Sequence, residues 1–158
     1  LQSFFNVEAV DNIINQQGKA KLVTSTNVFA HMSTLGDVMD GIVKLLDDDG
    51  YYCFENHYIM EILEKVQYDT FYHEHLRTYS LISLNKLFEM YNLNLFHAQI
   101  VTRYGGSIRC IVSKKKIEKT DSFKKLLEKE NKYLFENVEG NTQISKNAIA
   151  FSKQNNIG

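Results

Sequence analysis

Residues 20–31 read AKLVTSTNVFAH, and this stretch decides the fold. Its first half, residues 20–25, is short, rich in β-branched side chains and uncharged after Lys21, which is typical of a strand buried in a sheet. Its second half, residues 26–31, becomes polar where such a strand must end. The stretch therefore predicts a buried strand with a polar run at its carboxyl end.

Helical patterns lie on both sides of this strand. Residues 7–17 place Val7, Val10, Ile13 and Ile14 on one stripe, and Gly18 follows where a left-handed C-cap residue is expected. Residues 35–46 return to helical spacing, residues 47–50 (DDDG) are typical of a turn, and residues 51–55 (YYCFE) predict a second strand. Because helical spacing resumes over residues 59–66, the order predicts an α/β fold whose parallel sheet has helices on both faces.

The rest of the chain predicts an antiparallel hairpin and a helical connector. Ser80 can cap a helix over residues 81–91, and residues 93–101 and 107–113 predict two strands joined around Gly105 and Gly106. From residue 116 the pattern is a charged helix, with a break near Gly140 and a weaker helix through Ile144, Ala148 and Phe151. We therefore expect a sheet domain over residues 1–113 and a connector over residues 114–158.

Composition narrows the class of protein. With 158 residues and 44% hydrophobic content, the chain is large enough for one domain with its own core. A formal charge of −1 argues against a nucleic-acid surface, and no apolar run reaches the roughly 18 to 20 residues of a membrane span. Cys53 and Cys110 lack a CxxC spacing and are expected to be buried small hydrophobes. We expect a cytoplasmic protein that binds neither nucleic acid nor membranes.

Two polar runs are expected at one edge of the sheet. The first strand ends in residues 26–31 and the second in residues 55–57 (ENH). Ligands of open parallel sheets gather at the carboxyl ends of the strands, so these runs mark a candidate site.

Residues 70–76 read TFYHEHL and concentrate ionisable groups. In a helix, Tyr72 and His75 would share a face, which suits proton transfer. In a strand, His73 and His75 would share a face, which suits a metal-dependent hydrolase that borrows His57 and Glu55 as ligands. Spacing alone leaves both alternatives open.

Residues 103–109 (RYGGSIR) form the third candidate. Gly105 and Gly106 would allow backbone N–H groups to approach a ligand, Ser107 can donate to an oxygen, and Arg109 can pair with a phosphate. A simple glycine turn in a hairpin would give the same string.

Taken in order, the strings NVFAH (27–31), FYHEHL (71–76), YSL (79–81) and GGSIR (105–109) resemble the S-adenosylmethionine-dependent sugar C-methyltransferases. Members of that family methylate a carbon of nucleotide-linked 4-keto-deoxysugars. They have a zinc-binding N-terminal domain with four cysteines, a central class I methyltransferase domain and a C-terminal domain. The resemblance implies that this chain is the later half of the Rossmann-like methyltransferase sheet and a helical connector that leads toward the C-terminal domain.

The resemblance also implies roles for single residues. His75 would be the base that removes the proton next to the ketone, with Tyr72 and Glu74 supporting it and His31 near the reacting centre. Asn27 would lie near the amino-acid end of S-adenosylmethionine. The residues expected to face the nucleotide sugar are Gly105, Gly106, Ser107 and Arg109. No metal is implied in this segment.

The sequence departs from the family in several places. It has no GxGxG loop before its first helix and no zinc cysteines, so the principal cofactor loop and the zinc are expected only in the parent enzyme. Asn56 and His57 stand where the family often has Val-Pro, and Tyr104 stands where it usually has histidine. The rival hypothesis is a non-catalytic interaction module that keeps half of a methyltransferase sheet.

Overall fold

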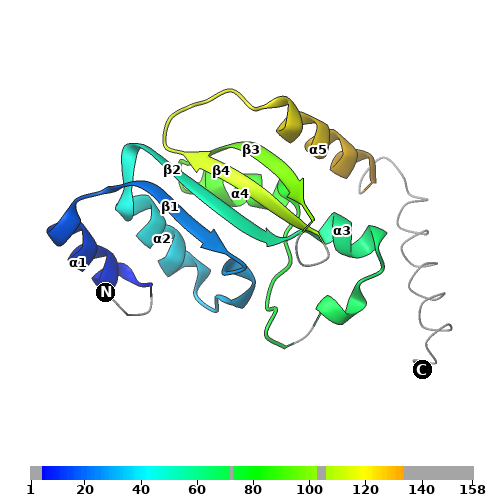
Figure 1. The fold of residues 1–158 in the computed structure, drawn as a ribbon, viewed down its shortest axis with the longest axis horizontal. Coiled ribbons are helices and arrows are strands. Elements are labelled where there is room, and N and C mark those ends of the chain that lie inside the picture. The colour runs from blue at the N-terminus through cyan, green and yellow to red at the C-terminus, as the bar shows by residue number, and fades with distance from the viewer. Residues whose placement is uncertain (1–4, 72, 103–105, 134–158) are drawn as a thin grey trace.

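The computed structural model describes residues 5–71, 73–102 and 106–133 of the chain (Figure 1). The first half contains α1 (Val7–Gln17), β1 (Ala20–Thr26), the 3-10 helix η1 (Phe29–His31), α2 (Leu35–Leu45) and β2 (Leu46–His57). The second half contains α3 (Ile59–Glu64), the 3-10 helix η2 (Tyr68–Thr70), α4 (Leu81–Met90), β3 (Asn94–Val101), β4 (Ser107–Ser113) and α5 (Asp121–Asn131). In these residues we find no helix long and apolar enough to cross a membrane.

Local sequence signals explain where the helices begin and end. The Asn6 side chain accepts a hydrogen bond from the Ala9 N–H at 2.8 Å, and Gly18 ends α1 with φ of 78°. Ser80 and Ser83 form a capping box at the start of α4, each side chain satisfying the other's backbone N–H. These boundaries agree with the sequence-based prediction.

The sheet has the order β1-β2-β4-β3. β1 and β2 are parallel, whereas β4 pairs antiparallel with both β2 and β3. The expected parallel pair and the expected antiparallel hairpin are therefore both present. The α/β class and the later half of a Rossmann-like sheet are confirmed.

The turn expected at residues 47–50 is wrong, because these residues belong to β2. The pairing shifts from Ala20–Leu46 to Leu22–Tyr51, so β2 advances five residues while β1 advances two. Gly50 permits this bulge, since a Cβ there would lie 2.8 Å from the Ala20 carbonyl oxygen. The acidic run is balanced by Lys21, which forms ion pairs with Asp47 and Asp49.

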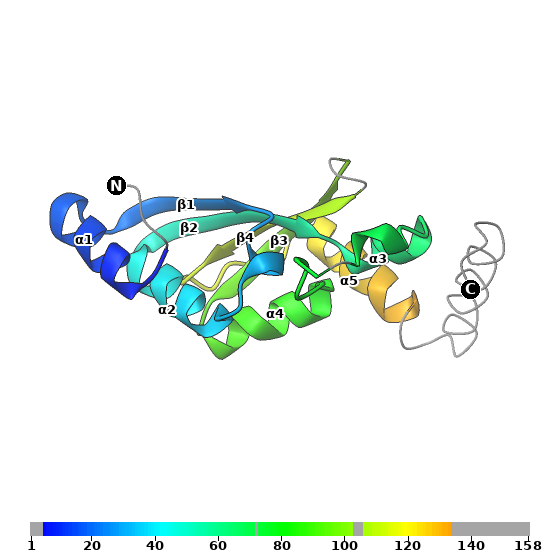
Figure 2. The same ribbon diagram turned by 90° about the horizontal axis from the view of Figure 1, so that it is seen from below.

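Helices cover one face of the sheet. Figure 2 shows α1, α2 and α4 on the same side of the strands. Their side chains and that face form the core, in which Phe29, Tyr52, Phe54 and Phe88 are fully buried and pack ring against ring. The opposite face carries Leu22, which is 62% exposed, so among the described elements we do not see the cover expected on both faces.

The described part of the expected connector packs onto the sheet. α5 lies along β3 and next to α4 (Figure 1), and Phe123 is buried in the core. The boundary near residue 114 stays a prediction, and the weaker helix through Ile144, Ala148 and Phe151 lies outside the described residues.

A buried carboxylate on α5 binds this helix to Tyr58 and to the start of α4. Glu130 is fully buried and accepts three hydrogen bonds: from the Tyr58 hydroxyl at 2.7 Å, and from the N–H groups of Leu81 and Ile82 at 2.8 Å each. The last two are first-turn donors of α4, where the helix dipole favours a negative charge. Burial and the Glu130 carboxylate together raise the pKa of Tyr58, so its hydroxyl remains a donor.

We expect Glu130→Ala to lower the free energy of unfolding by about 3 kcal/mol, because three buried donors lose their acceptor. Glu130→Gln keeps one acceptor oxygen and should lose roughly half as much. Urea unfolding followed by circular dichroism measures both. Glu128→Ala, at an exposed position of α5, is the matched control, and an equal loss in that control would contradict the role of Glu130.

Candidate active site

The candidate site lies where β1 and β2 end. Their register brings Thr26 beside Glu55, and the Asn27 N–H donates to the Glu55 carbonyl oxygen at 2.8 Å. Asn27 has φ of 54°, a left-handed conformation that asparagine tolerates better than most residues. This turn sends the chain directly into η1. The two polar runs therefore meet at one edge, as the sequence predicts.

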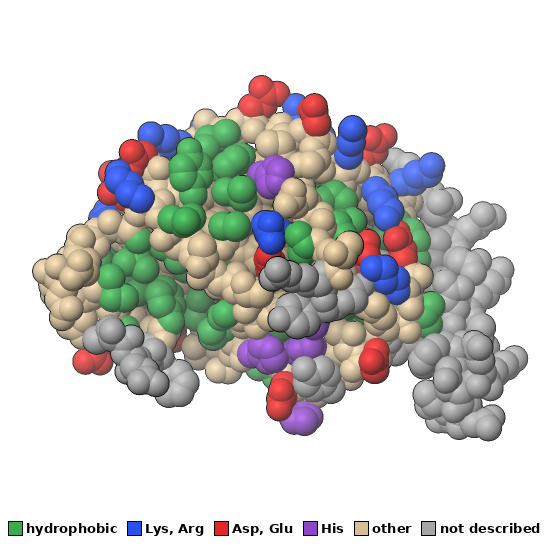
Figure 3. All heavy atoms as spheres, in the orientation of Figure 1, with side chains coloured by type: hydrophobic (Ala, Val, Ile, Leu, Met, Phe, Trp, Pro, Cys, Tyr) green, Lys and Arg blue, Asp and Glu red, His purple; other side chains and the backbone are tan. Residues whose placement is uncertain are grey.

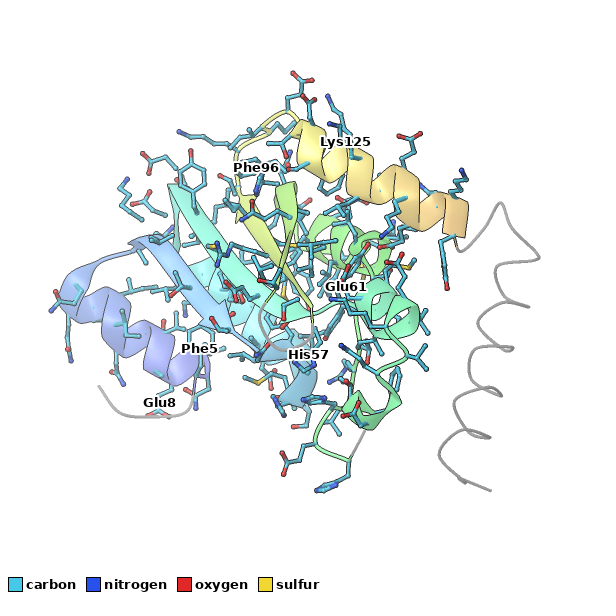
Figure 4. All side chains as sticks on the ribbon, turned by 45° about the vertical axis from the view of Figure 1, so that its right-hand side comes forward. Phe5, Glu8, His57, Glu61, Phe96 and Lys125 are labelled. Carbon is cyan, nitrogen blue, oxygen red and sulfur yellow. The ribbon has the colours of Figure 1, made fainter. Side chains whose placement is uncertain are left out.

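Three imidazole rings gather at this edge. His31 ends η1, His57 ends β2, and His75 belongs to the irregular segment that follows η2. The centroid of the His75 ring lies 4.9 Å from that of His31 and 4.9 Å from that of His57, with interplanar angles of 62° and 87°. Figure 3 shows histidine side chains side by side in the lower part of the face that it draws, and Figure 4 labels His57 near the end of β2.

Hydrogen bonds to backbone carbonyl oxygens hold the His75 segment against the η1 segment and the residues that follow it. The Leu76 N–H donates to the Ala30 carbonyl oxygen at 2.9 Å. The Arg77 guanidinium donates to the carbonyl oxygens of Met32 and Ser33. After residue 70, which ends η2, the described residues 71 and 73–76 form neither the helix nor the strand considered for this segment. These long-range contacts, and no local periodicity, place His75 between the other two rings.

A hydrogen bond fixes the tautomer of His75. Its Nδ1 lies 2.8 Å from the Thr70 carbonyl oxygen, which can only accept, so Nδ1 carries the hydrogen. In the neutral ring the lone pair then belongs to Nε2. His75 therefore has the form that a general base requires.

Several polar atoms at the strand ends are enclosed without a hydrogen-bond partner. Within the described part of the chain these are Asn27 Oδ1, Asn56 Nδ2 and His57 Nδ1, and only Asn94 Oδ1 is added from elsewhere. Buried polar atoms normally find partners, and unpaired ones concentrate where a ligand or an ordered water completes the set. A group with both donors and acceptors, such as the amino-acid end of a cofactor, fits this edge.

The environment of His57 keeps its imidazole neutral. Burial lowers the pKa of His57 below its usual 6.5, and the neighbouring His75 and His31 lower that pKa further. His57 and Asn56 belong to the polar run expected at this edge, but apart from the metal alternative for His57, sequence reasoning assigns neither of them a role. Their position at the end of a strand was the only signal that could have found them.

Of the expected substrate-binding residues, Ser107 and Arg109 lie on β4, and Gly106 directly precedes that strand. Ser107 is fully buried and pairs with His57 across the sheet. Arg109 pairs with Glu55, its Nε lying 2.8 Å from Glu55 Oε1. Gly105 lies outside the described residues. Gly106 is buried with φ of 129°, and a Cβ there would lie 2.7 Å from the Cβ and Oε2 atoms of Glu61.

Of the remaining expected site residues, Tyr72 and Glu74, the structure describes only Glu74, and Glu74 is not part of the cluster. Tyr72 lies outside the described residues. Glu74 is exposed, with Oε1 3.9 Å from Nε2 of His73, whose side chain is 88% exposed. Among the residues that the structure describes, no three His, Cys, Asp or Glu side chains are placed to hold a metal ion. The hydrolase alternative with His73 and His75 as metal ligands has no support in this geometry.

Comparison with known proteins identifies the family. Residues 1–98 match the model of the methyltransferase domain family, and the chain belongs to that family. The C-methyltransferase NovU of Streptomyces niveus is 36% identical over 104 residues, which is 66% of this chain and 25% of NovU. The predicted resemblance to C-methyltransferases is thereby confirmed. The chain spans about a quarter of the length of that curated relative.

Solved structures support the fold. A SAM-dependent methyltransferase from Anabaena variabilis aligns with a TM-score of 0.52 and 10% identity, covering 73% of this chain and 57% of that one. The complex of the Haloferax volcanii Trm112 methyltransferase activator with a methyltransferase aligns with a TM-score of 0.51 and 10% identity, covering 62% and 55%. At this identity the likeness concerns the fold alone.

We expect Gly106→Ala to destabilise the chain by about 3 kcal/mol, because the new methyl group meets Glu61 and the positive φ disfavours a side chain. Gly18→Ala is the matched control: Gly18 also has positive φ, but a Cβ there has no atom within 4 Å, so about 1 kcal/mol is expected. Thermal unfolding of the two variants separates the contact from the backbone strain. Equal losses would contradict the close approach of Glu61.

His57 should make stability depend on pH. The pKa of His57 is lower in the folded chain than in the unfolded chain. Its contribution to the free energy of unfolding is therefore complete above about pH 6.5, the unfolded pKa, and is lost as the pH falls through the folded pKa. Urea unfolding should therefore show that the free energy of unfolding falls more between pH 7.5 and pH 5.5 in the wild type than in His57→Gln. The exposed His73→Gln variant should lose as much as the wild type. A wild-type loss no larger than that of His57→Gln would contradict the lowered pKa.

Proposed function

We propose that this protein acts as an S-adenosylmethionine-dependent C-methyltransferase on a nucleotide-linked 4-keto-deoxysugar. The observation that carries the proposal is His75, whose Nδ1 is held by the Thr70 carbonyl oxygen and whose Nε2 is the basic nitrogen. The methyltransferase family and the match to NovU support the reaction class. The name of NovU specifies transfer to carbon, and the sugar is our expectation from the resembled family.

Carbon becomes a nucleophile only when a neighbouring proton is removed. In the proposed reaction His75 Nε2 takes that proton from the carbon next to the ketone. S-adenosylmethionine supplies the activated methyl group. His31, whose ring contacts that of His75, helps to orient it from the η1 side. Tyr72 and Glu74 stay proposed supporting groups from the same sequence motif.

Two sets of residues would hold the ligands. The enclosed Oδ1 of Asn27 lacks a donor, and the ammonium of the cofactor's amino-acid end is a donor of the right charge. On the other side, Gly105, Gly106, Ser107 and Arg109 would face the nucleotide sugar. Glu55 takes two of the five N–H donors of Arg109, which leaves others for a phosphate oxygen.

We expect His75→Ala to reduce methyl transfer by about 1,000-fold, because the base is lost. The full-length protein is incubated with S-adenosylmethionine and a panel of nucleotide 4-keto-deoxysugars, and the one-methyl mass gain is followed by mass spectrometry. His73→Ala removes an exposed imidazole two residues away and should keep nearly full activity. A His75→Ala enzyme as active as His73→Ala would refute the proposed base.

A further inference from the structure

We infer that His57 is a second catalytic residue, the hydrogen-bond donor that holds the ketone oxygen while His75 removes the neighbouring proton. This inference rests on the proposed function and deepens it. Removing the proton places negative charge on the ketone oxygen, and a donor fixed in advance at that oxygen stabilises the charge. The roles expected from sequence leave this oxygen without a partner.

The surroundings of His57 decide which ring nitrogen carries its hydrogen. Nδ1 is enclosed and has no hydrogen-bond partner among the described residues. An unpaired buried acceptor is tolerated more readily than an unpaired buried N–H, so the hydrogen belongs on Nε2. The residue as a whole is only partly buried, whereas its Nδ1 is enclosed, so Nε2 is the ring nitrogen that we assign to the ligand.

His75 has the opposite arrangement. Its Nδ1–H is bound to the Thr70 carbonyl oxygen, so its Nε2 has the lone pair. One Nε2 can therefore donate and the other can accept, and the two ring centroids are 4.9 Å apart. The carbon that loses its proton and the ketone oxygen are two bonds apart in the substrate. Two adjacent imidazoles can therefore serve both atoms of one substrate.

His57 is also kept from acting as an acid. Burial and the proximity of His75 and His31 lower the pKa of His57, so the ring is neutral at neutral pH. A neutral imidazole can stabilise an oxyanion by donating a hydrogen bond without giving up its proton. Two carboxylates of neighbouring segments are paired with cations: Glu55 with Arg109, and Glu61 with Lys65.

The step balances without a further reactant. The C–H bond next to the ketone breaks, its proton goes to His75 Nε2, and its electron pair moves into the new C=C bond while the C=O pair moves to oxygen. That oxygen accepts the hydrogen bond from His57 Nε2–H. No oxidant or reductant takes part.

Two variants of His57 distinguish a donor at Nε2 from a structural role. A glutamine carboxamide places its NH₂ group near the former Nε2, whereas the shorter asparagine places it near the former Nδ1. In the full-length protein we expect His57→Asn to lower kcat for methyl transfer about 100-fold with little change in KM, and His57→Gln to keep at least about a tenth of wild-type kcat. The rate at which the hydrogen next to the ketone exchanges with deuterium oxide, followed by NMR, should fall in the same order as kcat in the two variants. His73→Asn is the surface control.

The outcomes separate the inference from the proposed function. A wild-type protein that neither methylates nor exchanges any of the 4-keto-deoxysugars overturns the proposed function, and this inference with it. An active wild type with unchanged His57→Asn, or with equal losses in the two variants, overturns the donor role alone. The NMR shifts of ¹⁵N-labelled histidine give a readout apart from activity: a hydrogen on Nε2 of His57 supports the inference, and a hydrogen on Nδ1 overturns it.

Discussion

The parallel pairing of β1 with β2 is the constraint on which the site depends. Because both strands run the same way, their carboxyl ends reach the same edge, and the hydrogen bond from Asn27 to Glu55 closes that edge. The chain must then leave each strand by a turn, which brings η1 and His57 together. β4 completes the edge from the other side by pairing antiparallel with β2. The positions of His31 and His57 follow from this sheet order, whereas His75 is placed by the hydrogen bonds of its own segment to residues 30, 32 and 33.

Environment, and not residue type, gives the histidines different chemistry. His57 and His75 have the same side chain, yet the Nδ1 of one is enclosed without a partner and the Nδ1 of the other is bound to a carbonyl oxygen. In the proposed reaction Nε2 of His57 donates a hydrogen bond, whereas Nε2 of His75 has the lone pair that accepts the proton. The backbone carbonyl of Thr70 thus sets the tautomer of His75, and with it the proposed role of that ring as a base.

Much of the fold could be predicted from sequence because the signals are local. Asn6 and Gly18 delimit α1, Ser80 caps α4, and the hairpin strands are separated by glycines. The site could be predicted only in part. The edge follows from strand direction, but the role of His57 depends on contacts with segments 18 and 26 residues away, which no periodicity records. The acidic run at 47–50 has the composition of a turn. It continues a strand because Lys21 pairs with its carboxylates and because Gly50 has no side chain to meet the Ala20 carbonyl oxygen.

The position of Glu130 in the chain has a consequence for biosynthesis. The histidines of the cluster all precede residue 76, but the carboxylate that ties Tyr58 to the start of α4 lies 72 residues after Tyr58 and 49 after Leu81. During translation the three histidines therefore leave the ribosome well before Glu130, which hydrogen-bonds Tyr58 and the first turn of α4. A nascent chain stopped short of α5 would contain all the proposed catalytic residues but would lack the hydrogen bonds of Glu130 to Tyr58 and α4.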